Sequence, residues 1–276
     1  MRSIIKRVWR ITLSDSKSIN LILLQYKPED DYEKSIVSLD HFLSKRNIKK
    51  DTLILCPELS LQKYFCINKN KNNFNKAITI RSKTINDIKN IAKKYKVFLC
   101  ITFFEKNKDK FFNTCVIINK NGNIITKYNK NYIPSESCYH ERYYFNNSNN
   151  NFKTFSIGKM KIGLMICWDQ WHSNPYQIFK KKNVNLIICP TAIGGCYINQ
   201  KLVSLRNEKE KWLDVITANS LMNNIPVAVS NRIGTESENM DQLKFWGNSF
   251  ITNAHGDITN KCGTQKEVIE VKISKK

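Results

Sequence analysis

Short apolar runs alternate along the chain with longer stretches in which apolar residues recur every three or four positions. The short runs predict strands, and the longer periodic stretches predict amphipathic helices. The predicted strands cover residues 20–26, 52–56, 97–103, 112–118, 124–128, 152–157, 161–167, 185–189, 226–231, 244–252 and 267–273. The predicted helices cover residues 30–45, 86–94, 175–181 and 206–223.

This alternation favours a mixed α/β protein in which helices cover a strand-rich interior. In the last predicted helix, for example, Trp212 and Ile216 fall on one face. No internal repeat and no linker rich in Pro, Gly or Ser divides the chain. We therefore expect a single domain over residues 1–276, with residues 1–18 as an N-terminal extension and only a short tail after the last strand.

Composition narrows the class of protein further. The 276 residues are 41% hydrophobic, which is enough for a core, and 45 basic against 23 acidic residues give a net charge of +22. The lysines are scattered, without a basic helix, a zinc-binding spacing or an aromatic RNA-binding motif, so we expect no specific nucleic-acid partner.

The longest apolar runs fall far short of the ~20 residues of a membrane helix, and the start of the chain lacks the apolar centre of a secretory signal. We expect a cytoplasmic protein with no membrane partner.

Nine cysteines are spread over the chain, most of them inside apolar runs. The count is odd and no pair has the Cys-x-x-Cys spacing, so the sequence indicates neither a disulfide framework nor a zinc site. A cysteine within an apolar run is typically a small buried hydrophobic residue. A chain without disulfides is typical of a reducing compartment, which agrees with a cytosolic location.

Three reactive side chains follow apolar strands, namely Glu58, Lys130 and Cys167. Residues just beyond strand ends form the usual binding crevice of α/β folds. A carboxylate base, a cation for a developing oxyanion and a thiol nucleophile are the groups that acyl transfer needs. We expect the ammonium to lower the pKa of a neighbouring thiol. Each residue alone also has an ordinary interpretation: Lys130 as a surface charge, Glu58 as a helix cap and Cys167 as core packing.

Three strings surround these residues: Pro57-Glu58-Leu59, Tyr128-Asn-Lys130-Asn-Tyr-Ile-Pro134 and Cys167-Trp-Asp-Gln-Trp171. In order and spacing they resemble the three signatures of the carbon–nitrogen hydrolase (nitrilase) superfamily. Further strings are similar to its N-carbamoylputrescine amidase branch: Pro190-Thr-Ala-Ile-Gly194, Ser230-Asn-Arg-Ile-Gly234 and Trp246-Gly-Asn-Ser-Phe250. The resemblance extends from about residue 19 to residue 273. After Trp171 the chain departs from the family pattern, which usually continues with an aromatic residue, Pro and Glu, so an ion pair near the nucleophile is expected to be missing.

The resemblance implies a four-layer αββα sandwich and a Glu-Lys-Cys triad. Glu58 would be the general base, Cys167 the nucleophile and Lys130 the cation that stabilises the tetrahedral intermediate. The backbone N–H of Trp168 would be the second oxyanion donor. Glu141 matches a second glutamate that family members have near the site, and its alternative interpretation is a salt bridge to Lys130 or to the arginine that follows it.

Other side chains are assigned less specific roles. Trp168, Trp171 and Tyr64 are candidates to wall a short aliphatic substrate, although aromatic residues at such positions also serve as packing. Asp169 is interpreted as structural rather than as part of the substrate pocket. The resemblance implies neither a metal nor an organic cofactor. Because members of the superfamily are usually at least dimers, it also implies a homo-oligomer.

The activity implied by the resemblance is hydrolysis of the carbamoyl C–N bond of a small carbamoylated amine through a cysteine thioester-type intermediate. The preferred substrate is N-carbamoylputrescine, which would give putrescine, CO2 and ammonia in polyamine biosynthesis. One alternative is another amidase of the superfamily, such as a β-ureidopropionase or an N-carbamoyl-amino-acid hydrolase, with Arg232 as the cation to test for a substrate carboxylate. The other alternative is a degenerate, non-catalytic binding scaffold, against which the intact triad argues.

Overall fold

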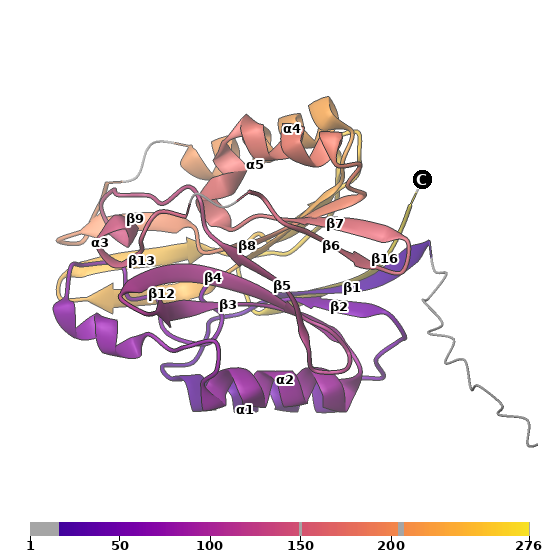
Figure 1. The fold of residues 1–276 in the computed structure, drawn as a ribbon. Coiled ribbons are helices and arrows are strands. Elements are labelled where there is room, and N and C mark those ends of the chain that lie inside the picture. The colour runs from indigo at the N-terminus through magenta and orange to yellow at the C-terminus, as the bar shows by residue number, and fades with distance from the viewer. Residues whose placement is uncertain (1–16, 149–150, 204–206, 276) are drawn as a thin grey trace, which may run out of the picture.

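The computed structural model describes residues 17–148, 151–203 and 207–275. Two six-stranded mixed sheets pack face to face, and helices cover the outer face of each (Figure 1). The first sheet has the order β16 (Glu267–Ser274), β1 (Ser18–Gln25), β2 (Thr52–Leu55), β3 (Phe98–Asn107), β4 (Lys110–Ile118) and β5 (Ile124–Asn129). The second has the order β15 (Ile258–Lys261), β14 (Phe250–Thr252), β11 (Val227–Asn231), β8 (Leu186–Thr191), β7 (Met160–Leu164) and β6 (Thr154–Ile157).

Alternation along the buried strands produces these layers. On β1, Leu21 and Leu23 belong to the core between the two sheets, whereas Ile22 and Leu24 belong to the core under the helices of the first sheet. Successive side chains of a strand point to opposite faces, and both faces of β1 are covered, so the run 21–24 at its centre is entirely apolar. The predicted αββα sandwich is thus the observed architecture.

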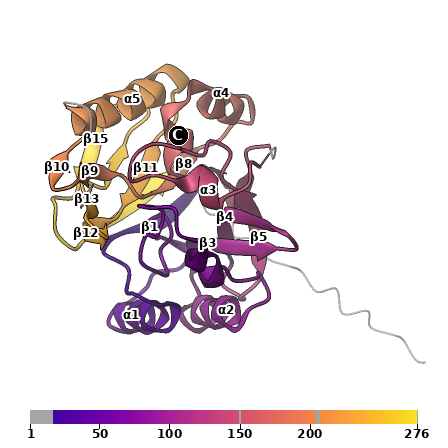
Figure 2. The same cartoon turned by 90° about the vertical axis from the view of Figure 1, so that its left-hand side faces the viewer.

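Two pairs of helices form the outer layers, as the turned view makes clear (Figure 2). The helices are α1 (Tyr32–Ser44) and α2 (Lys83–Tyr95) on the first sheet, and α4 (Ser173–Lys181) and α5 (Glu208–Asn223) on the second. Asp31 caps α1 by accepting a hydrogen bond from the backbone N–H of Lys34 at 2.8 Å. Short helical segments are η1 (Lys71–Lys76), α3 (Glu141–Tyr144) and η2 (Cys167–Trp171). Within the described residues, no helix has both the length and the apolar character needed to cross a membrane.

A third, four-stranded sheet lies at one end of the sandwich and was not predicted as a unit. Its order is β10 (Lys201–Leu202), β9 (Gly194–Ile198), β13 (Asp241–Trp246) and β12 (Ile233–Glu238). The predicted strand 244–252 is wrong as a single element, because it is divided into β13 and β14. Gly247 and Asn248 both adopt positive φ at the division, so the chain leaves the third sheet there and enters the second.

One disulfide, between Cys138 and Cys196, corrects the expectation that the chain has none. Its Cα atoms lie 5.8 Å apart although the two residues are separated by 58 positions in sequence. An odd cysteine count and the lack of a Cys-x-x-Cys spacing carry no information about such a distant pair. Cysteine usage therefore no longer argues for a reducing compartment.

Candidate active site

Cys167 lies at a sharp turn between β7 and η2. It is the first residue of η2, its φ is +42°, and only 3% of its surface is exposed. Its Sγ atom lies 4.0 Å from the carbonyl oxygen of Ala192. A non-glycine residue with positive φ is costly, and such residues cluster at functional sites because the surrounding structure holds them there. The turn thus places a thiol at the end of a buried strand.

Lys130 joins the two glutamates that sequence analysis singled out. Its Nζ atom lies 2.8 Å from Oε1 of Glu58 and 2.6 Å from Oε2 of Glu141, and all three side chains are fully buried. Glu58 follows β2, Lys130 follows β5, and Glu141 begins α3. Buried charges persist only when they are paired and hydrogen-bonded, so the ammonium and its two carboxylates form one electrostatic unit.

Glu58 has a further partner that the sequence did not reveal. The side-chain amide of Asn113, on β4, donates to Oε1 of Glu58 at 2.7 Å. The backbone N–H of Glu58 donates to the carbonyl of Thr191 at 3.2 Å. Its other carboxylate oxygen, Oε2, is buried and has no hydrogen-bond partner within the described residues. The carboxylate of Glu58 is thus fixed through one oxygen, while the second oxygen has no hydrogen bond from the described residues.

Glu141 is a partner of both Lys130 and Tyr64. The hydroxyl of Tyr64 donates to Oε1 of Glu141 at 2.9 Å, and its ring is buried. Burial raises the pKa of Glu141 to about 7, although Lys130 opposes this change. The salt bridge considered as the alternative for Glu141 does form with Lys130, whereas Nε of Arg142 donates to the carbonyl of Ile133 instead.

The charges around Cys167 show that the four groups share one site. Burial raises the pKa of the Cys167 thiol, Glu58 raises it further, and Lys130 lowers it, with a net value well above the ordinary one. The expectation that the ammonium lowers the pKa of the thiol below its ordinary value is therefore wrong, because burial and the two glutamates outweigh the effect of Lys130. Burial by itself would lower the pKa of Lys130, but Glu141 and Glu58 raise it well above its usual value. The site holds a neutral thiol beside a permanent cation.

Asp169 ties together the segments that carry Lys130 and Cys167. Its carboxylate accepts hydrogen bonds from the Tyr128 hydroxyl at 2.7 Å, from the backbone N–H of Ile166 at 2.9 Å and from the backbone N–H of Tyr132 at 3.0 Å. Burial raises the pKa of Asp169 to about 6 against these bonds. This is the structural role that the sequence suggested for Asp169.

Aromatic side chains surround the turn. Trp168 and Trp171 are half-buried, with ring centroids 5.7 Å apart, so their assignment as substrate walls stays a prediction. His172, where the family pattern changes, stacks on Tyr132 with centroids 3.6 Å apart. The Tyr139 hydroxyl donates to the carbonyl of Gly194 at 3.0 Å and accepts from its N–H at 2.7 Å.

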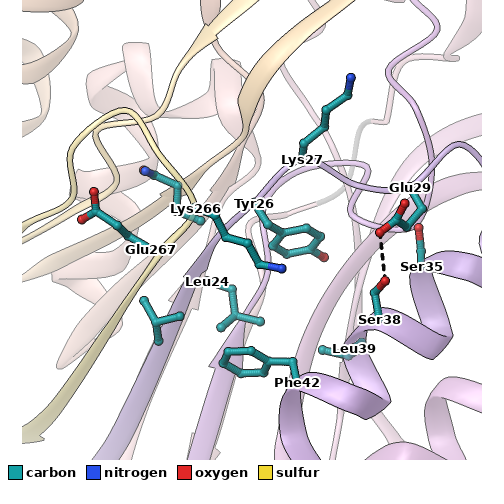
Figure 3. Close-up of a pocket in the computed structure, with 12 residues that line it drawn as sticks. Leu24, Tyr26, Lys27, Glu29, Ser35, Ser38, Leu39, Phe42, Lys266 and Glu267 are labelled. Atoms are coloured by element: carbon teal, nitrogen blue, oxygen red, sulfur yellow. Dashed lines mark hydrogen bonds between the residues drawn. The ribbon is translucent and has the colours of Figure 1, made fainter.

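A cavity of about 50 Å³ between α1 and the first sheet contains none of these residues (Figure 3). Its apolar floor includes Leu24 and Phe42, and Ser38 donates to Glu29 at its rim at 2.9 Å. This volume is room for a few water molecules rather than for a substrate. Among the described residues, no group of three or more His, Cys, Asp or Glu side chains is arranged to hold a metal ion.

Known proteins share this architecture. The sequence profile of the carbon-nitrogen hydrolase family matches residues 34–276. A citrullinase of Francisella tularensis is 30% identical over 241 residues, 87% of this chain and 83% of that protein. An N-carbamoylputrescine amidase of Arabidopsis thaliana is 30% identical over 253 residues, 90% of this chain and 83% of that protein. A carbon-nitrogen hydrolase structure from Helicobacter pylori superposes with a TM-score of 0.84 at 26% identity, covering 93% of this chain and 89% of that chain.

The paired sheets flanked by helices and the match to these relatives define the class of protein as an amidohydrolase that acts on C–N bonds other than peptide bonds. The chain belongs to the carbon-nitrogen hydrolase (nitrilase) superfamily.

Proposed function

We propose that this amidohydrolase removes the terminal carbamoyl group of N-carbamoylputrescine. The proposal rests on the buried cluster in which Lys130 bridges Glu58 and Glu141 next to Cys167. It also rests on the similarity to N-carbamoylputrescine amidases. A ureido group is small and uncharged, so it can enter a site whose reactive side chains are withdrawn from water.

The reaction begins when Glu58 takes the proton of Cys167 and the sulfur attacks the ureido carbon. The oxyanion that forms is stabilised by the Lys130 ammonium and by the backbone N–H of Trp168. Glu58 returns its proton to the terminal nitrogen, the C–N bond breaks, and ammonia leaves an S-carbamoyl enzyme. Glu58 then deprotonates a water molecule, which displaces the sulfur. The resulting carbamate loses CO2 to give the free amine.

The neutral thiol fits this sequence of steps. Because the pKa of Cys167 is raised, the proton has to be removed as the S–C bond forms, and this requires a base within the site. The unpartnered Oε2 of Glu58 supplies such an acceptor. Lys130 remains protonated throughout, so it acts as a fixed charge rather than as a proton donor.

The surroundings of Arg232 support an amine rather than an amino acid as the substrate. Arg232 is the cation that a substrate carboxylate would have used. Its guanidinium is fully buried and is bonded to Glu236 and to backbone carbonyls. It is therefore engaged within the protein.

A second candidate substrate is citrulline, which carries the same ureido group on an amino acid and is favoured by the similarity to the citrullinase. Ammonia release should be measured with N-carbamoylputrescine, L-citrulline and N-carbamoyl-β-alanine, with Cys167→Ala as the control. We expect release from the first compound and loss of at least ~10²-fold in the variant. Release from citrulline or N-carbamoyl-β-alanine alone would reject N-carbamoylputrescine, and full turnover by Cys167→Ala would reject the mechanism.

A further inference from the structure

Arg232, at the junction of β11 and β12, bonds to the backbone that carries the base. Its NH1 group donates to the carbonyls of Glu58 at 3.1 Å, Leu59 at 2.9 Å and Gln62 at 3.3 Å. Its NH2 group donates to Gln62 at 3.2 Å and to the carboxylate of Glu236. One guanidinium thus donates hydrogen bonds to three backbone carbonyls of the turn that follows β2.

This turn needs such a donor. Leu59 adopts a positive φ of +47°, which costs about 1–2 kcal/mol for a residue with a side chain. Glu58 and Leu59 are fully buried, so their carbonyls have no access to solvent and must be paired within the protein. The planar guanidinium of an arginine offers five N–H donors in a fixed arrangement, whereas a lysine ammonium offers three donors from a single nitrogen.

A second series of hydrogen bonds leads from Arg232 to Glu141. The Glu236 carboxylate, held by Arg232, also accepts a hydrogen bond from the backbone N–H of Tyr64. The hydroxyl of the same tyrosine donates to Glu141. Contacts from one buried ion pair therefore extend to the backbone of Glu58 and, through Tyr64, to the carboxylate of Glu141, the two residues that flank Lys130.

We propose that Arg232 is a positioning residue for the reaction: it sets the place of the Glu58 carboxylate relative to Cys167, and Glu236 extends this control to Glu141 through Tyr64. The part of the test that measures ammonia release rests on the proposed function, whereas the part that measures alkylation of Cys167 does not. A purely structural arginine would affect folding and leave the chemistry of Cys167 unchanged.

The test compares three proteins. Arg232→Met/Glu236→Gln removes the ion pair as a whole, so no unpaired charge is left in the core. Arg232→Lys keeps the charge but loses the planar guanidinium. Arg46→Met/Glu270→Gln is the matched control, because it removes an arginine–glutamate pair that is partly exposed and lies 3.5 Å apart on another face.

Three quantities are measured: kcat and KM for ammonia release, the melting temperature, and the pH midpoint of Cys167 alkylation by iodoacetamide followed by mass spectrometry. For both Arg232 variants we expect kcat to fall, by about 10²-fold in the double variant, with KM changed less than about 3-fold. We expect the alkylation midpoint to move to lower pH, because a displaced Glu58 no longer raises the pKa of the thiol. The control variant should leave kcat and the alkylation midpoint unchanged.

An Arg232→Met/Glu236→Gln protein that unfolds cooperatively with wild-type kcat and an unmoved alkylation midpoint would overturn the proposal. If that protein does not fold, Arg232→Lys decides on the same two readouts. A fall in kcat without any movement of the midpoint would also overturn it. If the wild type releases ammonia from none of the ureido compounds, the proposed function fails, while the alkylation midpoint still decides the role of Arg232.

Discussion

The hydroxyl of Tyr128 donates a hydrogen bond of 2.7 Å to the carboxylate of Asp169, and this bond connects the two halves of the site. Tyr128 lies on β5, two residues before Lys130, and Asp169 lies two residues after Cys167. Lys130 and Cys167 follow strands of different sheets, so the distance between them depends on this contact and on the two backbone bonds to the same carboxylate.

Asp169→Asn is therefore expected to weaken both folding and turnover. An amide offers one acceptor oxygen where the carboxylate offers two, and its NH2 group would face a backbone N–H. Leaving a buried donor unpaired costs about 1–3 kcal/mol. Thermal unfolding and ammonia release measure the effect, with Asp87→Asn, at a partly exposed position on α2, as the control. Equal behaviour of the two variants would contradict the linking role of Asp169.

Lys130→Met is expected to abolish turnover and to destabilise the fold. Breaking a buried ion pair by removing one partner typically costs 3–5 kcal/mol, and here two carboxylates would lose their common cation. Lys130→Met/Glu141→Gln should recover part of the melting temperature, because one uncompensated charge is gone, but no activity. Lys94→Met, which removes an exposed cation, serves as the control and should change stability by less than about 1 kcal/mol. Activity in the double variant would exclude Lys130 from the chemistry.

Glu141 should make stability depend on pH near neutrality. Burial raises its pKa from 4.5 to about 7, so between these values the folded protein holds more protons than the unfolded chain. Its contribution to stability is complete below about pH 4.5 and is lost as the pH rises through about 7. From pH 5 to pH 8 we expect the melting temperature of the wild type to fall relative to that of Glu141→Gln. Parallel curves for the two proteins would show that Glu141 does not titrate in this range.

The disulfide between Cys138 and Cys196 should stabilise the fold measurably. Bridges that close long loops typically contribute about 2–4 kcal/mol, and this one spans 58 positions. Cys138→Ser/Cys196→Ser should have a lower urea midpoint than the wild type and a steeper slope, because the unfolded chain without the bridge is more expanded and exposes more surface. A reducing agent should lower the wild-type midpoint and leave that of the double variant where it is. A wild-type midpoint that ignores reduction would mean that the bridge contributes nothing.

Periodicity predicted a mixed α/β protein because the central strands are buried on both faces and read as apolar runs, whereas the four-layer arrangement was implied by the resemblance to the nitrilase superfamily. The strands β2 and β8 begin and end within a residue or two of their predicted bounds. Glu58, Lys130 and Cys167 could be selected as candidate site residues because each follows such a strand within a specific string.

The sequence could not predict features that depend on contacts between distant residues or on polar strands. The strand β12 is largely polar, and Asn113 is one of several polar residues of β4, so neither has a distinctive local pattern. The sequence around Arg232 suggests a substrate contact, because nothing in it indicates that the guanidinium pairs with Glu236 and with carbonyls of the turn after β2. The pKa of Cys167 depends on how deeply the turn is buried, which spacing does not express.

At Gly194, where β9 begins, a Cβ atom would lie 2.2 Å from the carbonyl oxygen of Lys244 on the neighbouring strand. No other amino acid can replace this glycine without pushing β9 and β13 apart. The N–H and the carbonyl of Gly194 also both hydrogen-bond to the hydroxyl of Tyr139. The two hydrogen bonds that hold Tyr139 therefore come from the main chain at a position that tolerates no side chain, so the orientation of this tyrosine does not depend on any variable residue at position 194.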